Sequence, residues 1–381
     1  MPIQLYTTLL RQTQQLRPGE RRTRTRLWAW LLTGLYLSRS VHLSRIADKI
    51  PSAATQPSTT RRLSRLLDNP ALRVRLWYEP VARTLLERAA QSGEIRLLVD
   101  GSKVGFGHQL LMVALAYGRR ALPLVWTWVP CPRGHSTALK QRALLGYVQR
   151  LVPVGARVLV VGDSEFGAVE VMRQLEAWGW FYVLRQKASH LVEVGQAAPA
   201  APALPCSAGS ASELAVTWQP VGSLLEKPGQ RRWLPGVRLT KLHAHPTNLL
   251  LHWQRGEKEA WLLATNLGSA HAAWLGYRRR MWIEEMFGDC KGHGFDLEST
   301  HLQHVARLSR LVLAVALLYL WLVVYGVAII KRGLRRLVDR ADRRDYSLFR
   351  LGCNMVERCL TNGHEPFNLG FPASFPKLSG S

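Results

Sequence analysis

Two aspartates follow apolar stretches that are typical of buried strands. Asp100 comes directly after the stretch IRLLV, and Asp163 comes directly after RVLVVG. Neighbouring strands of one sheet lie about 5 Å apart, so two carboxylates that emerge from core strands can converge. Carboxylates in such positions are costly unless a cation or a metal ion pairs with them. The alternative is a turn aspartate after each strand, because turns favour this residue for backbone reasons.

A third carboxylate lies on a predicted helix further along the chain. In the segment YRRRMWIEEMFGDCKG, the residues Tyr277, Arg280, Glu284 and Lys291 are separated by 3, 4 and 7 positions. At about 100° per residue, a single helix places these four side chains within roughly 60° of one another. One helical face would then present a phenol, a guanidinium, a carboxylate and an ammonium. The alternative is an exposed helix on which Arg280 and Glu284 form an ordinary i,i+4 ion pair.

The elements that would position these residues follow from the apolar pattern. From residue 94, the runs EIRLLVDGSKVG, HQLLMVALAYG and ALPLVWTWVPC predict three strands. GHSTALKQRALLGYVQRL predicts a helix with Ser136 or Thr137 as its cap. RVLVVGDSEFG, AVEVMRQLEAWG and WFYVLRQK then predict a strand, a helix and a strand. The order is a meander that passes into βαβ units, which is an α/β pattern.

The second half of the chain changes character twice. Residues 195–212 carry no charge and are rich in Ala, Pro, Gly and Ser, so they predict a linker or long loop. The runs that follow look like short strands, and we expect residues 191–268 to form a linker and a β-rich insertion. Residues 269–350 are predicted to hold the charged helix, an apolar helix and a basic arm. We expect residues 351–381 to form an irregular C-terminal tail.

The N-terminal region is basic and helical. Residues 1–93 contain 16 Lys and Arg against 5 Asp and Glu, and their apolar residues recur at helical spacing. A helix over Ser40–Ile50 is followed by STTRRLSRLLDNP, which predicts a second helix capped by Ser58 or Thr59. Arg61, Arg62 and Arg65 lie along one side of that second helix. Two interpretations stay open: a helix-turn-helix reader of DNA bases and a helical bundle that contacts only phosphates.

The overall composition points to a polyanionic partner. Of 381 residues, 51 are Lys or Arg and 26 are Asp or Glu, which gives a net charge of +25 and a pI near 10.7. Nucleic acid is the first partner class that such an excess suggests. Five cysteines without a framework spacing argue against a disulfide-stapled secreted protein. The N-terminus lacks the pattern of a signal peptide, so we expect a cytoplasmic protein.

One apolar segment, Leu311–Ile330, has the length of a bilayer-spanning helix and carries no charge. It is a single segment and stands beside the charged helix. We therefore interpret it as a helix buried in a large core and expect no membrane association.

Taken together, these motifs resemble the DDE transposases of the insertion-sequence "IS-four" family, which are relatives of the cut-and-paste transposases of bacterial composite transposons. The spacing Y-x2-R-x3-E-x6-K is similar to that family's signature, and LLVDGSKVGFG and VVGDSEFG resemble its two aspartate motifs. The resemblance runs from about residue 94 to 330. It implies a ribonuclease-H-like catalytic core interrupted by a β-rich insertion, with an N-terminal helical DNA-binding region. The core would begin in residues 94–190 and resume in 269–350.

The resemblance also implies residue roles. Asp100, Asp163 and Glu284 would be the DDE triad and hold two Mg²⁺ ions, for which Mn²⁺ can substitute. Hard oxygen ligands suit Mg²⁺. Two metals can assist the in-line displacements of phosphodiester hydrolysis and strand transfer.

Tyr277, Arg280 and Lys291 would grip phosphates near the transposon end. The partners implied are double-stranded DNA, as terminal inverted repeats and target, and a second copy in a dimeric synaptic complex. Family members also pass through a hairpin at the transposon end and stack a flipped base on tryptophan. Location at the bacterial nucleoid is the corresponding expectation.

Several alternatives remain beside this interpretation. Glu165 lies two residues after Asp163 and is a rival metal ligand. Cys290, His293, Cys353 and Cys359 could suggest zinc, but their spacing matches no strong zinc pattern. At the level of the whole chain, the rivals are an inactive DNA-binding relic of a transposase and a ribonuclease-H-fold nuclease that cleaves without joining.

Overall fold

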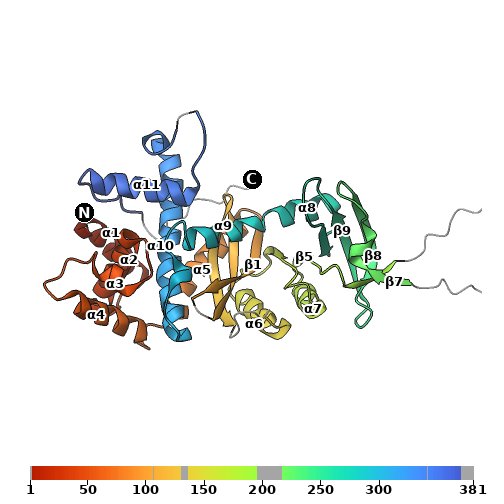
Figure 1. Ribbon diagram of the computed structural model, residues 1–381, viewed down its shortest axis with the longest axis horizontal. Coiled ribbons are helices and arrows are strands. Elements are labelled where there is room, and N and C mark those ends of the chain that lie inside the picture. Colours follow the sequence, from red (N-terminus) through yellow and green to blue (C-terminus); the bar gives the residue numbers. More distant parts are fainter. Residues whose placement is uncertain (1, 106, 130–135, 195–216, 341, 370–381) are drawn as a thin grey trace, which may run out of the picture. The chain divides into compact units, whose positions relative to one another are not determined.

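The computed structural model describes residues 2–105, 107–129, 136–194, 217–340 and 342–369. These residues divide into two compact units (Figure 1). Unit 1 comprises the described residues of Met1–Ser136, Ala143–Arg157 and Met281–Ser381. Unit 2 comprises those of Thr137–Arg142 and Val158–Arg280. Residues 195–212, the predicted linker, lie outside the described residues.

Unit 1 begins with the predicted helices. They are α1 (Pro2–Leu16), α2 (Arg22–Ser38), α3 (Leu43–Ala47), α4 (Gln56–Asp68) and α5 (Val74–Gln91). Their buried faces are apolar, with Trp28 on α2 and Trp77 on α5 packed ring against ring at 5.1 Å between centroids. The arginines of this region lie mainly on the outer faces, as the helical spacing of the apolar residues requires.

Helix α4 begins one turn before the predicted cap residues. Its N-cap is Thr55, whose hydroxyl accepts a hydrogen bond from the backbone N–H of Ser58 at 3.4 Å. The prediction that Ser58 or Thr59 caps this helix is therefore wrong. Pro57 fits inside the first helical turn, where its missing N–H has no partner to lose, so the helix starts before the proline.

Three antiparallel strands form the sheet of unit 1, in the order β3-β2-β1. They are β1 (Glu94–Val104), β2 (His108–Tyr117) and β3 (Arg120–Val129), which confirms the predicted meander. Gly118 and Arg119 join β2 to β3 with φ of 50° and 64°. Two consecutive left-handed residues make the tight hairpin turn that matches strand twist. This turn makes Arg120 the first residue of β3, opposite Tyr117.

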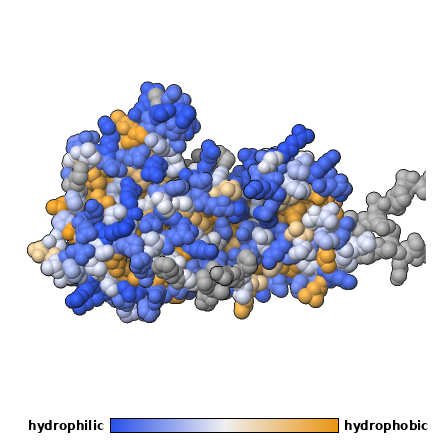
Figure 2. Space-filling model, in the orientation of Figure 1, coloured by the Kyte–Doolittle hydropathy of each residue, from blue (hydrophilic) through white to orange (hydrophobic). Residues whose placement is uncertain are grey.

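The apolar segment forms the central helix of unit 1, α10 (Val305–Lys331). Among the described residues it is the single helix long and apolar enough to cross a membrane, judged by length and composition alone. It packs against α2, α4, α5 and β3, and 89% of its most apolar stretch is buried inside the protein (Figure 1). The prediction of a buried core helix is confirmed. The face drawn in Figure 2 is mainly hydrophilic, with apolar residues interspersed.

A C-terminal helix, α11 (Leu348–Thr361), packs along α10, so the prediction of an irregular tail from residue 351 is wrong over this stretch. Ser347 caps the helix by accepting a hydrogen bond from the N–H of Arg350 at 3.2 Å. Two glycines allow the close packing: a Cβ on Gly326 would overlap the carbonyl oxygen of Leu348, and a Cβ on Gly352 that of Leu322. These two glycines mark the place where the helices cross.

Unit 2 carries a second set of strands in the order β4-β5-β10-β9-β8-β6-β7. β4 and β5 are parallel and joined by α7, which confirms the predicted βαβ unit; the other pairs are antiparallel. Strands β6 to β10 fall within residues 191–268, for which the sequence predicted a linker and a β-rich insertion. The elements are β4 (Arg157–Gly162), α7 (Val169–Ala177), β5 (Phe181–Arg185), β6 (Leu191–Val194), β7 (Thr217–Pro220), η1 (Val221–Leu224), β8 (Arg231–Leu239), β9 (His245–His252), β10 (Trp261–Thr265) and α8 (Ala270–Arg278).

The remaining elements are α6 (Ala138–Gln149), α9 (Met281–Cys290) and the short 3-10 turns η2 (Leu297–Ser299) and η3 (Leu334–Leu337). Helix α6 begins after Thr137, whose hydroxyl accepts from the N–H of Lys140 at 3.4 Å, as one of the two predicted caps.

Candidate active site

Asp100 lies within β1 and not after it. The strand continues for four residues to Val104, and Asp100 pairs in register with Met112 of β2. Its side chain is half-buried and accepts a hydrogen bond from the backbone N–H of Gly101 at 2.7 Å. The interpretation as a turn aspartate does not hold at this position. A half-buried carboxylate inside a strand is costly unless hydrogen bonds or a cation offset its loss of hydration.

Asp163 follows β4 directly, at the start of a tight turn. One of its carboxylate oxygens accepts the N–H of Glu165 at 2.9 Å, and its carbonyl accepts the N–H of Phe166 at 3.1 Å. Gly167 closes the turn against β5, because a Cβ there would lie 2.6 Å from the carbonyl oxygen of Arg185. The GDSEFG motif therefore fixes Asp163 at the carboxyl end of a parallel strand, where α/β proteins commonly place ligands.

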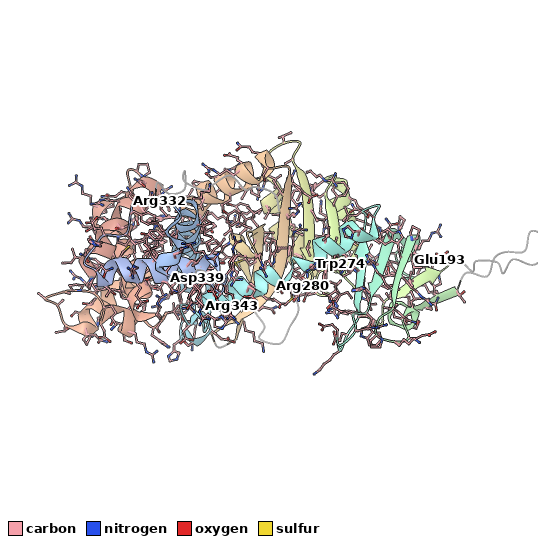
Figure 3. All side chains as sticks on the ribbon, turned by 90° about the horizontal axis from the view of Figure 1, so that it is seen from above. Glu193, Trp274, Arg280, Arg332, Asp339 and Arg343 are labelled. Carbon is pink, nitrogen blue, oxygen red and sulfur yellow. The ribbon has the colours of Figure 1, made fainter. Side chains whose placement is uncertain are left out.

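The segment from Tyr277 to Lys291 is two helices and not one. Helix α8 ends at Arg278, α9 starts at Met281, and the backbone N–H groups of Arg279 and Arg280 bond three residues back, to Gly276 and Tyr277. These shorter bonds tighten and end α8 without glycine or proline. The predicted stripe of four residues on a single helical face is therefore wrong. Figure 3 labels Trp274 on α8 and Arg280 between the two helices.

Tyr277 and Arg280 nevertheless stay together in unit 2. The guanidinium of Arg280 lies 5.9 Å from the centre of the Tyr277 ring, and this ring packs edge-on against Trp261 at 5.0 Å. Burial raises the pKa of the Tyr277 hydroxyl, Arg280 and Arg185 oppose that rise, and the negative charge of Asp163 adds to it. The charges of Asp163, Arg185 and Arg280 therefore all act on the Tyr277 hydroxyl. Within unit 2, the predicted metal ligand Asp163 and the predicted DNA ligands Tyr277 and Arg280 share one electrostatic environment.

Glu284 lies on α9 in unit 1, which also contains Asp100. The helix packs on the β1–β3 sheet through its buried residues, among them Ile283, Met286 and Phe287. Glu284 itself is half-buried. The structure therefore places the carriers of two predicted metal ligands, β1 and α9, in contact within one unit. Asp163 belongs to unit 2.

Helix α9 is also held by a residue that the sequence analysis did not single out. Arg120 forms ion pairs with Asp289 at 2.9 Å and with Glu285 at 3.3 Å. Burial raises the pKa of the Asp289 carboxyl to about 6, against the lowering effect of Arg120. The signal available in the sequence was weak: an arginine after a hairpin turn and two acids spaced i,i+4.

Lys291 directly follows α9 and its ammonium group lies 3.2 Å from the carboxylate of Glu298. Glu165, the rival ligand, is half-buried in the turn that Asp163 begins. Cys290 and Cys353 are buried thiols. In the part of the chain that the structure describes, no three His, Cys, Asp or Glu side chains are grouped to hold a metal ion. This finding covers Asp100, Asp163 and Glu284 as well as the cysteines and His293 considered for zinc.

The three predicted carboxylates fit a hard divalent cation by the chemistry of their donor atoms. Asp100 and Glu284 are half-buried, so each would gain from a cation that offsets its loss of hydration. This donor chemistry favours Mg²⁺ or Mn²⁺ over a softer metal.

Arg61, Arg62 and Arg65 are exposed on α4, and Leu63, Leu66 and Leu67 hold the other face of that helix in the core. The predicted basic arm follows α10 through η3 and carries its own ion pairs. Arg335 pairs with Asp339, and Arg343 with Asp345. Figure 3 labels Asp339 and Arg343 of this arm.

A cleft in unit 2 holds cationic and aromatic residues that the sequence analysis also missed. Its volume is about 480 Å³, and its lining includes Ser164, Arg185, Lys187, Trp253, Lys258 and Glu259. The carboxylate of Glu259 lies 2.7 Å from the guanidinium of Arg185. The indole N–H of Trp253 donates to the carbonyl of Glu257 at 2.9 Å. Cations and an indole face suit phosphates and bases. Their separation along the sequence, in β5 and in the β9–β10 turn, hid this grouping.

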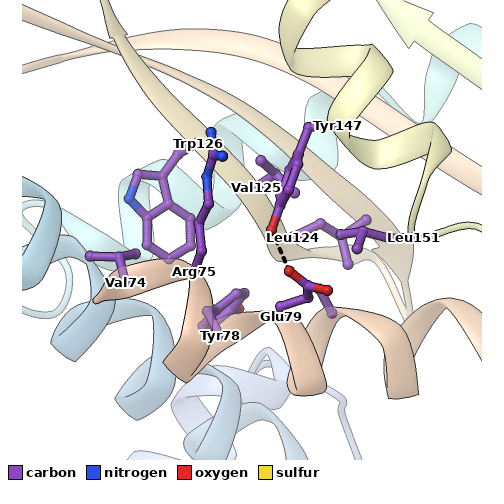
Figure 4. A pocket seen from close by; sticks show the side chains of 10 residues that line it. Val74, Arg75, Tyr78, Glu79, Leu124, Val125, Trp126, Tyr147 and Leu151 are labelled. Carbon is purple, nitrogen blue, oxygen red and sulfur yellow. Dashed lines mark hydrogen bonds between the residues drawn. The ribbon is translucent and has the colours of Figure 1, made fainter. Parts of the chain in front are cut away.

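A second cavity lies in unit 1 beside α5, β3 and α6 (Figure 4). The hydroxyl of Tyr147 donates to Glu79 at 2.8 Å, and Arg75 covers the Tyr147 ring at 4.5 Å. Its volume of about 40 Å³ holds a few water molecules and is far below the roughly 300 Å³ or more of ligand pockets.

The α/β architecture carries the three predicted carboxylates in β1, directly after β4 and on α9. The sequence matches the model of the transposase DDE domain family over residues 94–321, and the chain belongs to this family. No curated protein matches the sequence. The match confirms the expected α/β class with a ribonuclease-H-like core, and it is consistent with the narrower "IS-four" resemblance.

Two solved structures are similar to the chain. The piggyBac transposase synaptic complex with hairpin DNA aligns with a TM-score of 0.44 and 10% identity, covering 92% of this chain and 76% of that one. The catalytic domain of Mos1 mariner transposase aligns with a TM-score of 0.19 and 14% identity, covering 27% of this chain and 56% of that one.

Proposed function

We propose that this transposase moves an insertion sequence by a cut-and-paste reaction, through hydrolysis and strand transfer at the ends of the element. One observation carries the proposal: the family match spans residues 94–321 and contains Asp100, Asp163 and Glu284 in the expected order. Further support comes from unit 1, where β1 and α9, the elements that carry two of these carboxylates, pack together.

The three carboxylates hold the divalent metal ions in this proposal. Metal ions bound there supply activation of the attacking oxygen and stabilisation of the leaving oxygen in an in-line displacement. The protein's own contribution is to fix Asp100 in a strand, Asp163 in the turn after β4 and Glu284 on a helix. Tyr277, Arg280 and Lys291 orient the phosphate in this proposal. The arginine offers a planar fork and the lysine a point charge.

The DNA partner is supported by the charge of the chain. The net charge of +25 suits a polyanion, and the exposed arginines Arg61, Arg62 and Arg65 of α4 supply phosphate contacts in the proposal. The similar piggyBac structure is a synaptic complex with DNA. A pair of transposase copies on two element ends is part of the proposal.

A hairpin intermediate at the element end is the finer step. The cleft lined by Arg185, Lys187 and Trp253 is where we place the end nucleotide, because cations hold phosphate and an indole stacks on a base. Trp253→Ala would then reduce hairpin formation, with first-strand nicking retained.

The test is a reaction in vitro on DNA that carries the boundaries of the element encoding this protein. Wild type is expected to nick at a defined boundary with Mg²⁺, to release hairpin ends, and to join pre-cut 3′-hydroxyl ends to a target. Cleavage without any joining would favour a nuclease. Binding without cleavage would favour a DNA-binding relic.

A further inference from the structure

One guanidinium from the sheet of unit 1 forms ion pairs with two carboxylates of helix α9. Arg120 lies 2.9 Å from a carboxylate oxygen of Asp289 and 3.3 Å from one of Glu285. The two acids are four residues apart, so they stand on one side of the helix, one turn above the other. A planar group that contacts both restrains the helix along its axis and in rotation about it.

Burial makes this contact more than a surface ion pair. The side chains of Arg120 and Asp289 are 14% and 8% exposed, and that of Glu285 is 54% exposed. Isolated charges at such depth are costly, and the loss of one partner leaves the other buried without compensation. The ring of Tyr319, from α10, is fully buried. Burial raises the pKa of its hydroxyl, the negative charges of Asp289 and Glu285 add to that rise, and Arg120 opposes it.

Arg120 is itself held by the backbone. It is the first residue of β3, directly after the two left-handed residues Gly118 and Arg119. The base of a two-residue hairpin has a fixed register, because the turn geometry sets which residues face each other. The position of the guanidinium is thus set by the sheet that also carries Asp100.

Glu284 is the immediate neighbour of Glu285 on α9. Since successive residues point about 100° apart, Glu284 faces a different direction from the ion-paired side. A helix that turns or slides on the sheet moves the Glu284 carboxylate with it. Small displacements matter, because misplacement of a catalytic group by about 1 Å can cost about 100-fold in rate.

We propose that Arg120, through Asp289 and Glu285, is a positioning residue that sets the place of Glu284 relative to Asp100. The proposal rests on the proposed function, because it takes Glu284 as a metal ligand. All of the residues named in this proposal lie in unit 1.

The test compares Arg120→Gln, Arg120→Lys and Asp289→Asn with wild type in single-turnover cleavage of element-end DNA. Arg120→Gln is expected to lower the rate about 10- to 100-fold and to raise the Mn²⁺ concentration needed for half-maximal rate. Arg120→Lys, a point charge that reaches one carboxylate, is expected to recover part of the loss. Affinity for end DNA stays within about twofold.

Two further readouts separate positioning from loss of folding. Amide hydrogen exchange over residues 281–290, measured without metal or DNA, is expected to be faster in Arg120→Gln and Asp289→Asn. The double variant Arg120→Gln/Asp289→Asn is expected to be no slower in cleavage than the worse single variant, because the two residues act as a pair. Arg83→Gln, which breaks the exposed Arg83–Glu79 pair of α5, is the matched control for a lost arginine.

Glu284→Gln is run alongside. If this variant cleaves like wild type, the proposed function fails, whatever Arg120 does. If Glu284→Gln is inactive while Arg120→Gln keeps the wild-type rate, Mn²⁺ requirement and exchange rates, the positioning role alone is refuted. Additive losses in the double variant would also refute it, since they mean that Arg120 and Asp289 act separately.

Discussion

The carboxylates in and beside the candidate site differ in their burial and in their hydrogen-bond or ion-pair partners. Asp100 sits inside a strand with its carboxylate half-buried, and Asp163 begins a turn that uses the same carboxylate as an internal acceptor. Asp289, which has no assigned chemistry, is more deeply buried than either and depends on Arg120. Burial by itself therefore does not mark the chemistry here.

The raised pKa of Asp289 predicts how the stability of the protein changes with pH. Its pKa is about 6 in the folded protein, against about 3.8 in the unfolded chain. Between these values the folded state binds more protons than the unfolded state, so this residue's contribution to stability decreases as pH rises from about 4 to 6. The decrease amounts to about 2–3 kcal/mol.

Asp289→Asn removes this titration. The stability of the variant relative to wild type is therefore expected to increase between pH 4 and pH 7, measured by urea unfolding at several pH values. Asp339→Asn is the comparison at a carboxyl whose pKa lies below its ordinary value. A difference between Asp289→Asn and wild type that stays constant with pH would contradict the raised pKa.

At the scale of elements, caps and close contacts decide where helices begin and how they cross. Thr55, not Ser58, caps α4, the helix that presents Arg61, Arg62 and Arg65. Replacing Thr55 by Ala is expected to cost about 1 kcal/mol of unfolding free energy, because one N–H at the helix start loses its acceptor. Ser58→Ala, within the same turn, is expected to change stability by less than about 0.5 kcal/mol. If Thr55→Ala and Ser58→Ala lost the same unfolding free energy in urea, the assignment of Thr55 as the N-cap would be contradicted.

The crossing of α10 and α11 gives a second prediction for an element. Gly326→Ala places a methyl group against the carbonyl of Leu348, on the backbone of the neighbouring helix. Overpacking of this kind costs about 1–3 kcal/mol, so the melting temperature is expected to fall. Gly292→Ala, where a Cβ meets no neighbour within 4 Å, is the matched control. A Gly326→Ala protein as stable as the control would mean that the helices are not in close contact.

The sequence predicted strands better than helix ends. Five apolar runs between residues 94 and 187, separated by turns or a helix, predicted β1 to β5, because buried strands read as continuous apolar stretches. The break at Arg279–Arg280 could not be predicted, since it comes from three-residue hydrogen bonds and not from glycine or proline. The ion pairs of Arg120 were hidden because they join residues 165 or more positions apart, which no local pattern records.

At the scale of the whole molecule, charge dominates the expected behaviour. The net charge of +25 predicts that binding to element-end DNA depends strongly on salt. For six to ten phosphate contacts, affinity is expected to fall by about 10³–10⁵ between 50 and 200 mM salt. Changing Arg61, Arg62 and Arg65 together to Gln is expected to reduce the slope of log affinity against log salt by up to about 3. A weak salt dependence would contradict the electrostatic part of the account.

The central claim is that Asp100, Asp163 and Glu284 form the catalytic triad of a DNA transposase. The most direct test compares wild type, Glu284→Gln and Glu165→Gln for cleavage at the element boundary, each with Mg²⁺ and with EDTA. We expect Glu284→Gln to lose at least about 1,000-fold in rate, roughly 4 kcal/mol, while it still binds the end DNA. Glu165→Gln is expected to cleave at nearly the wild-type rate. Metal-dependent cleavage that survives Glu284→Gln, or is lost in Glu165→Gln instead, would contradict the assignment.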